Sequence, residues 1–180
     1  INRLFIACIT ERKAVISEDS RKWGTFKFAS LLLRIYFHLG QLNLVQNVLK
    51  ALQACELPSV DRFPRTHTVI FNFFLGRYHF GREEFEQAEA RFAFCYDRLN
   101  PFDYLKQINL IIHLMIPIKL ILHLQRPTPE LIAMLSDPQS RLFYTDLCKF
   151  ISTGDLLNYN QLMEVNSKSM LKFGTFAIYE

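Results

Sequence analysis

Residues Asn72–Pro101 read NFFLGRYHFGREEFEQAEARFAFCYDRLNP, and their spacing is typical of a tetratricopeptide helical hairpin. The L-G-x2-Y…A-x3-F ladder of that repeat is matched at every gap, with histidine at the aromatic position, by Leu75, Gly76, His79, Ala88 and Phe92. The small residues Gly76 and Ala88 predict that two helices approach closely. The large residues of the same stretch are expected to fill the seam between the helices: Phe80, Phe85 and Phe92. Such a hairpin cannot bury its apolar face alone, so we expect neighbouring helices and a binding surface rather than a catalytic cleft.

The composition indicates a folded helical domain. Half of the 180 residues are hydrophobic and 14% are aromatic, which excludes a disordered chain. The four cysteines contain no C-x2-C pair and are expected to be free thiols. The most apolar run, Ile108–Leu124, includes His113, Pro117, Lys119 and His123. We therefore predict a buried helix kinked at the proline, not a membrane span.

Helix-breaking and capping residues divide the chain into about ten helices with no convincing strand. The expected helices are Ser20–Leu39, Leu42–Cys55, Thr66–Phe80, Glu83–Leu99, Asp103–His123, Thr128–Leu135, Ser140–Ser152, Leu156–Val165 and Ser167–Glu180. The hairpin ladder recurs weakly after Gly40 and after Gly154, at unequal spacing. The prediction is an all-α fold: a divergent, right-handed α-solenoid of tetratricopeptide-like hairpins.

The net charge of +4 is concentrated near the amino terminus. Residues 1–34 contain seven basic and three acidic side chains, whereas residues 35–180 contain 14 of each. The candidate partner or nucleic-acid site is the basic cluster Arg12, Lys13, Arg21, Lys22, Lys27 and Arg34. An acidic partner, nucleic acid and a solvated basic edge are the three interpretations of this cluster. Trp23 and Phe26 are expected to anchor the core rather than stack on a base.

No pattern in the sequence predicts an enzyme. The five histidines form no closely spaced ligand pairs with one another or with cysteine, and His38 and His113 are expected to be packing residues. Cys95 stands on the packed face of the hairpin without an evident base. The acidic run Glu83–Glu86 is expected to interact with a helix dipole, and no glycine-rich phosphate loop occurs. We therefore expect no catalytic residue, no cofactor and no metal.

Several segments, in the same order along nearly the whole chain, resemble the PCI-domain family of PCI-domain-containing protein 2. The segments are Ser20–Gly24 (SRKWG), Leu33–Phe37 (LRIYF), Phe74–Gly76 (FLG), Ile112–Leu120 (IHLMIPIKL), Gly154–Leu156 (GDL) and Phe173–Glu180 (FGTFAIYE). The family has an mRNA-export branch and a branch associated with the COP9 signalosome, and the choice between them stays open.

The resemblance implies a non-enzymatic scaffold subunit that pairs with a larger PCI-domain protein and a small acidic subunit shared with the proteasome lid. It implies a nuclear location, in the export branch at the nuclear pore, with no membrane association. The family's PCI domain ends in a winged helix, which would follow near Glu180. We therefore expect residues 1–180 to be a single helical-repeat region, a fragment that lacks this module. Direct RNA or DNA binding through the basic amino-terminal helices is the alternative function.

Overall fold

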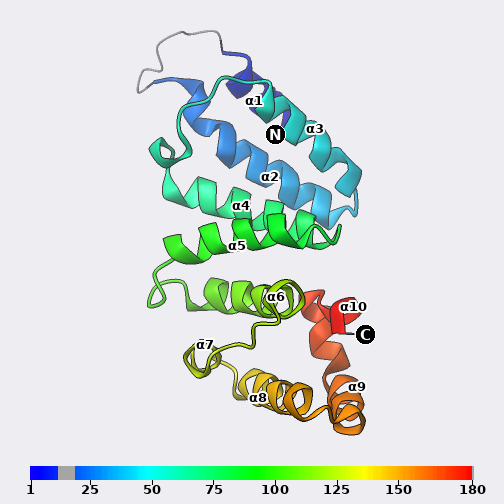
Figure 1. The fold of residues 1–180 in the computed structure, drawn as a ribbon. Helices are drawn as coiled ribbons and strands as arrows, with labels where there is room; N and C mark the ends of the chain where they lie inside the picture. The colour runs from blue at the N-terminus through cyan, green and yellow to red at the C-terminus, as the bar shows by residue number, and fades with distance from the viewer. Residues whose placement is uncertain (12–18, 180) are drawn as a thin grey trace. The chain divides into compact units, whose positions relative to one another are not determined.

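The computed structural model describes residues 1–11 and 19–179, and the chain divides into two compact units, Ile1–Arg98 and Leu99–Glu180. The described residues form ten α-helices and three short 3-10 helices, without a strand. The predicted all-α fold is therefore confirmed (Figure 1).

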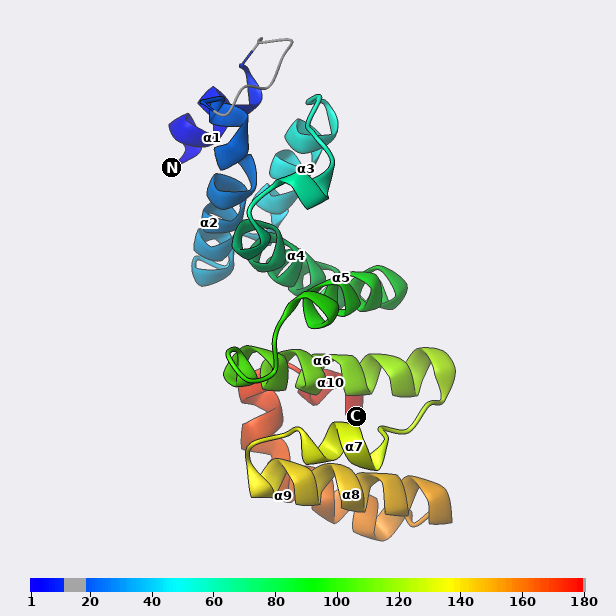
Figure 2. The same cartoon turned by 90° about the vertical axis from the view of Figure 1, so that its left-hand side faces the viewer.

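The first unit is built around helix α4. Its helices are α1 (Asn2–Ile9), α2 (Thr25–His38), α3 (Val45–Gln53), α4 (Arg65–Phe80) and α5 (Phe85–Arg98), with 3-10 turns at Arg21–Gly24, Leu42–Leu44 and Val60–Arg62. Helix α4 packs against α2 on one side and against α5 on the other, so that α2, α4 and α5 form successive layers (Figure 1). Helix α3 lies beside α2 and diverges from α5 (Figure 2).

The hairpin of α4 and α5 has the close approach that its small residues predict. A Cβ atom added to Gly76 would lie 2.8 Å from Cε1 of Phe92, whose ring is fully buried. Ala88 is also fully buried. Phe80 packs edge-on against Phe85 and Phe92, with ring centroids 6.1 and 6.5 Å away. The predicted aromatic seam is therefore present.

Aromatic rings join the start of α2 to α4. The ring of Phe26 packs edge-on against Phe63, at 4.7 Å between centroids, and lies 5.1 Å from Phe71. Trp23 contacts the same Phe63 ring at 5.2 Å. Trp23 and Phe26 therefore belong to the core of this unit, as predicted.

The second unit contains helices α6 (Leu105–His123), α7 (Pro129–Ala133), α8 (Pro138–Thr153), α9 (Leu156–Phe173) and α10 (Phe176–Tyr179). Helix α7 lies between α6 and α8 (Figure 2), and α9 packs against α6, α8 and α10. Helix α6 runs continuously through Pro117. By length and mean hydropathy (1.6) it could cross a membrane, but 56% of its apolar window is buried within the structure.

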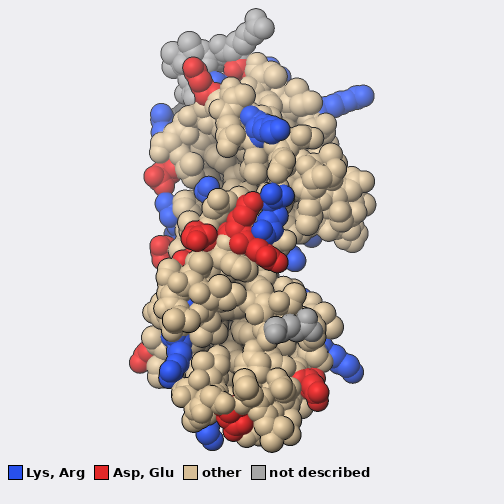
Figure 3. Space-filling model, turned by 45° about the vertical axis from the view of Figure 1, so that its right-hand side comes forward, with Lys and Arg blue, Asp and Glu red and all other residues tan. Residues whose placement is uncertain are grey.

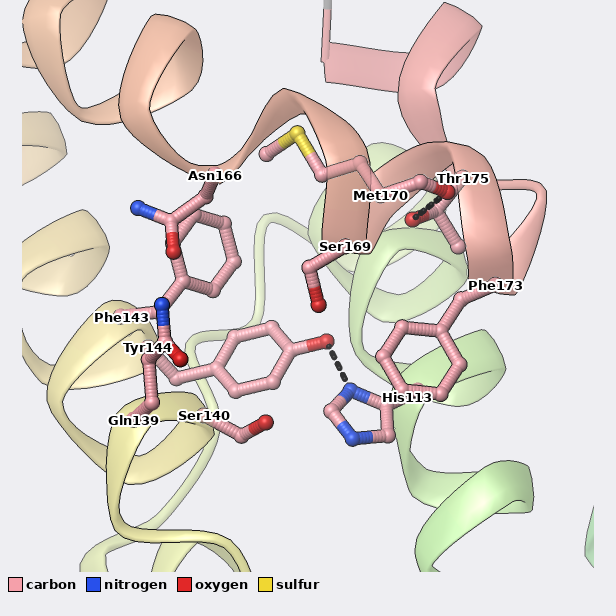
Figure 4. Close-up of a pocket in the computed structure, with 10 residues that line it drawn as sticks. All are labelled: His113, Gln139, Ser140, Phe143, Tyr144, Asn166, Ser169, Met170, Phe173 and Thr175. Carbon is pink, nitrogen blue, oxygen red and sulfur yellow. Dashed lines mark hydrogen bonds between the residues drawn. The ribbon is translucent and has the colours of Figure 1, made fainter.

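His113 of α6 is the polar centre of this unit. Its Nδ1 shares a hydrogen bond of 2.9 Å with the hydroxyl of Tyr144 on α8, and its ring stacks on Phe173 of α9 at 3.9 Å (Figure 4). Because the side chain is only 6% exposed, it satisfies a buried polar atom while joining three helices. The prediction that His113 is a packing residue is confirmed.

Some helix ends have the capping residues that the sequence predicts, and others do not. Ser20, Thr128 and Asp155 accept hydrogen bonds from the backbone N–H groups of the turns that follow them, as predicted. Asp103 does not cap α6, because its carboxylate accepts a hydrogen bond from Asn100 instead. Ser167 does not start a new helix: its hydroxyl donates to the carbonyl of Glu164 within α9.

We expect replacement of Gly76 by alanine to destabilise the first unit. The added methyl group would lie 2.8–3.1 Å from three atoms of the fully buried ring of Phe92, so the ring would have to shift within the core. Overpacking of this kind costs about 1–3 kcal/mol, which exceeds the gain of about 1 kcal/mol in helix propensity. The measurement is the urea midpoint of unfolding followed by circular dichroism.

Gly81→Ala is the matched control for this change. Gly81 has an ordinary helical φ of −70°, and an added Cβ would meet its nearest neighbouring atom at 3.6 Å. This variant should unfold at or slightly above the midpoint of the wild type. Equal midpoints for the Gly76 and Gly81 variants would contradict the close approach.

We expect the second unit to lose stability as the pH falls from about 6.5 to about 4. Burial lowers the pKa of His113 to about 4 from its ordinary value of 6.5. Between these values the unfolded chain binds a proton that the folded chain does not, so acid favours unfolding, by about 3 kcal/mol at most. The measurement is the free energy of unfolding at several pH values.

His113→Phe should flatten this pH dependence, since it keeps the aromatic stack and removes the titrating group. It should also lower the stability at pH 7, because the Tyr144 hydroxyl loses its partner. His67, whose pKa is also lowered by burial, is tested separately with His67→Gln. An unchanged slope in His113→Phe would show that another group controls the acid response.

Candidate functional site

The described residues bring together no group of three or more His, Cys, Asp and Glu side chains that could hold a metal ion. The two histidines that were predicted to be packing residues differ in burial. His113 is buried as described above, whereas His38 is the last residue of α2 and is exposed. The prediction that His38 is a packing residue is therefore wrong, because the described helices leave the end of α2 exposed from His38 to Gly40.

Cys95 on α5 is held as a neutral thiol. It is fully buried, and its Sγ donates a hydrogen bond to the carbonyl oxygen of Val69 at 3.3 Å. Burial raises the pKa of this thiol to about 12. The thiolate that a nucleophile requires is thus disfavoured, and the side chain contributes packing between α4 and α5.

The acidic run at the start of α5 forms ion pairs in place of a carboxylate pair. Glu84 accepts a hydrogen bond from Nε of Arg82 at 2.8 Å, and its other oxygen lies 2.6 Å from Nδ1 of His79. Only Glu86 lies in the first turn of α5, where the dipole interaction was predicted. His79, at the aromatic position of the repeat ladder, thus bonds to the turn that joins the two helices.

The basic cluster is only partly available at the surface. Arg12 and Lys13 lie outside the described residues. Lys22 is buried, and its Nζ donates a hydrogen bond to the carbonyl oxygen of Glu56 at 3.2 Å. Three of the six predicted residues are exposed on described elements: Arg21, Lys27 and Arg34.

Lys27 and Arg34 lie together on a groove between α2 and α4. The groove has a volume of about 260 Å³, and its α2 side also includes Ser30 and Leu31. The two cations are seven residues apart, which places them on one face of the helix. Neither makes an ion pair within the described part of the chain.

The α4 side of the groove combines an imidazole with apolar side chains: His67, Ile70 and Phe74. Nδ1 of His67 is buried and has no hydrogen-bond partner among the described atoms. Burial, together with the nearby charge of Lys27, lowers the pKa of His67. The imidazole is therefore neutral at pH 7, with an unused polar atom.

The two helices that form the groove contain no acidic residue, but four basic ones: Lys27, Arg34, Arg65 and Arg77. The guanidinium of Arg77 lies over the ring of Phe37, which packs against Phe74 of the groove. This absence of acids is local, since the face of the molecule in Figure 3 carries Lys and Arg interspersed with Asp and Glu. The groove is therefore a positively charged site with an apolar lining.

The cations of this groove were predicted from the sequence, whereas His67, Ile70 and Phe74 were not. They recur at three- and four-residue spacing on α4, which is a usable signal for one helix face. The pairing of that face with the Lys27–Arg34 face was not predicted, because it depends on how α2 and α4 cross.

Comparison of the sequence with known proteins identifies several named relatives. No family model matches the chain. It is 30% identical over 176 residues to the "Protein CSN12 homolog" of Schizosaccharomyces pombe, covering 96% of this chain and 40% of that protein. It is 31% identical over 183 residues to the protein of the same name in Mycosarcoma maydis, covering all of this chain and 40% of that protein.

A second group of relatives carries another name. The chain is 24% identical over 176 residues to "PCI domain-containing protein 2" of Xenopus laevis, covering 98% of this chain and 42% of that protein. The chain thus spans about two fifths of the length of the curated relatives described here. Both names are matched along nearly the whole sequence, as the resemblance of its ordered segments predicted. The chain belongs to the PCI-domain family that contains the CSN12 homologs and PCI domain-containing protein 2.

Proposed function

We propose that this chain is the helical scaffold segment of a subunit in a multiprotein PCI complex, and that it binds a small acidic partner through the groove between α2 and α4. The names of the relatives support a subunit of such a complex. In this proposal a larger PCI-domain protein is the second partner. The complex acts in the nucleus, in mRNA export or in association with the COP9 signalosome.

The observation that carries the proposal is the composition of the groove. Lys27 and Arg34 line it and form no ion pair with another described residue, and the two helices that form it contain no acidic side chain. Between the cations, Leu31 and Phe74 offer half-buried apolar surface. An acidic segment with interspersed apolar residues complements both features.

Direct nucleic-acid binding is less well supported by the same surface. Single-stranded nucleic acid is held by aromatic rings that stack on its bases, beside a cationic groove. Trp23, which lies within the basic cluster, already packs against Phe63 and lies under the guanidinium of Arg62. Phe26 and Phe28, beside Lys27, also pack in the core. The apolar lining of the groove also suits peptide side chains better than a phosphate backbone.

We expect the double variant Lys27→Glu, Arg34→Glu to bind an acidic peptide about 10- to 100-fold more weakly than the wild type. Reversal of two charges replaces attraction by repulsion, at about 1–3 kcal/mol in total for partly exposed groups. The measurement is fluorescence anisotropy with a labelled 20-residue peptide in which Asp and Glu alternate with Leu and Phe. Wild-type affinity should fall as NaCl is raised.

Lys50→Glu is the control, because Lys50 is exposed on α3 of the same unit and does not line the groove. It should bind the peptide with nearly wild-type affinity. Equal loss in the control would mean that net charge alone governs binding. If labelled single-stranded RNA bound tightly at physiological salt through Lys27 and Arg34, while the acidic peptide did not bind, the scaffold proposal would be wrong.

A further inference from the structure

A second groove lies on another face of α4, between α3 and α5. Its volume is about 660 Å³, which makes it much larger than the basic groove. It lies where α3 and α5 diverge (Figure 2). Three helices supply much of its apolar lining: Leu49 and Leu52 from α3, Phe71 and Leu75 from α4, and Ala90 and Phe94 from α5. Phe26 of α2 and the residues Leu57, Pro58 and Val60 between α3 and α4 supply the rest.

Asn72 and Arg91 form a hydrogen-bonded pair among the polar side chains of this groove, and the other polar lining residues are Gln53, His79, Glu86 and Gln87. Asn72 of α4 is only 4% exposed, and its Nδ2 donates a hydrogen bond to the carbonyl oxygen of Thr68 at 2.8 Å. Its Oδ1 accepts one from Nη1 of Arg91 on α5, at 3.3 Å. The buried amide thus holds the guanidinium at the groove. Arg91 itself is exposed, and its other N–H groups are available to a carboxylate.

Ion pairs mark both ends of the groove. At the end near the start of α5, His79 and Arg82 bond to Glu84. At the opposite end, the guanidinium of Arg98 covers the ring of Phe94 at 3.7 Å. The same guanidinium pairs with Asp61 of the 3-10 turn that precedes α4. The lining stripe on α5 extends from Glu86 to Phe94, which corresponds to about 12 Å along a helix axis, or about two turns.

We infer that this groove binds a short amphipathic helix of a protein partner, with an acidic residue facing Arg91. A helix satisfies its own backbone groups, whereas an extended peptide would leave them unpaired against apolar side chains. The described residues offer no strand edge with which such a peptide could pair. About two turns place apolar residues at i, i+3 and i+7 on the floor of the groove.

This inference rests on the proposed scaffold role in one respect only: both assume that the ligand is a protein. The acidic segment and the amphipathic helix occupy different faces of α4, and they depend on different residues. Variants on one face therefore test one proposal without disturbing the other.

The probe is a capped 14-residue helical peptide with Leu at positions 3, 6 and 10 and Glu at position 7. A matched peptide carries Lys at position 7. Binding to the whole chain is measured by anisotropy, and the site is mapped by amide chemical shifts in NMR spectra. We expect the Glu peptide to bind at least about fivefold more tightly than the Lys peptide, since a charge-assisted hydrogen bond replaces a repulsion. The shifts should be confined to residues of α3, α4 and α5 that line the groove.

Two variants and a control complete the experiment. Arg91→Ala should abolish the difference between the peptides. Ala90→Glu should weaken the Glu peptide by about tenfold or more, because it puts a charge on the apolar floor beside the ligand's carboxylate. Ala54→Glu, at an exposed alanine away from the groove, should leave binding unchanged. Lys27→Glu, Arg34→Glu should also leave it unchanged.

Three results would overturn the inference. One is equal affinity for both peptides, and another is a set of shifts outside the groove. The third is self-association of the wild-type chain, measured by sedimentation, that Ala90→Glu abolishes, since the occupant would then be a second copy. The two proposals can fail separately. If the Lys27→Glu, Arg34→Glu variant loses the acidic peptide but still binds the amphipathic peptide, the two sites are independent, and a negative result at one site leaves the other proposal standing.

Discussion

The contact between Gly76 and Phe92 sets how closely α4 and α5 approach, and the surfaces of the first unit depend on it. Because glycine has no side chain at this position, the buried ring of Phe92 can lie directly on the backbone of α4. With one face of α4 packed tightly against α5, its other faces contact α2 and line the groove between α3 and α5. Helix α4 therefore contributes to both grooves, with His67, Ile70 and Phe74 on one face and Phe71, Asn72 and Leu75 on another.

The two grooves differ in the chemistry that they offer. The α2–α4 groove is bordered by cations on helices that lack acidic residues, so electrostatic attraction can draw an acidic segment toward it. The α3–α5 groove is mostly apolar, with a single guanidinium held by a buried amide. One face of α4 can thus attract an acidic segment at long range, whereas another face can bury the apolar side chains of a partner. A subunit that holds more than one partner requires surfaces of this kind.

The second unit depends on a different kind of contact. His113 carries a hydrogen bond to Tyr144 and an aromatic stack on Phe173, which together join α6, α8 and α9. The adjoining cavity, lined by Ser140 and Asn166 among others, has a volume of about 20 Å³. That is room for about one water molecule, so this cluster is a structural centre and not a ligand site. The apolar character of α6 is likewise explained by its burial.

The sequence by itself determined the helical class and most helix boundaries, because these depend on local spacing, capping and turn residues, and its ordered segments resembled the family. Gly76, Ala88 and Phe92 specified a hairpin, and Gly40 and Gly154 end their helices with the positive φ that glycine tolerates. The errors at Asp103 and Ser167 arose where a capping residue type had an alternative partner, Asn100 in one case and the carbonyl of Glu164 in the other.

Only the tertiary structure decided which residues can meet a partner. It buried Lys22 against the carbonyl of Glu56, exposed His38, and placed Lys27 and Arg34 beside His67 of another helix. It also brought Arg91 to Asn72 across the hairpin, 19 positions away in the sequence. These placements depend on how helices cross and diverge. Crossing geometry results from the packing of many side chains at once, so no local spacing in the sequence encodes it.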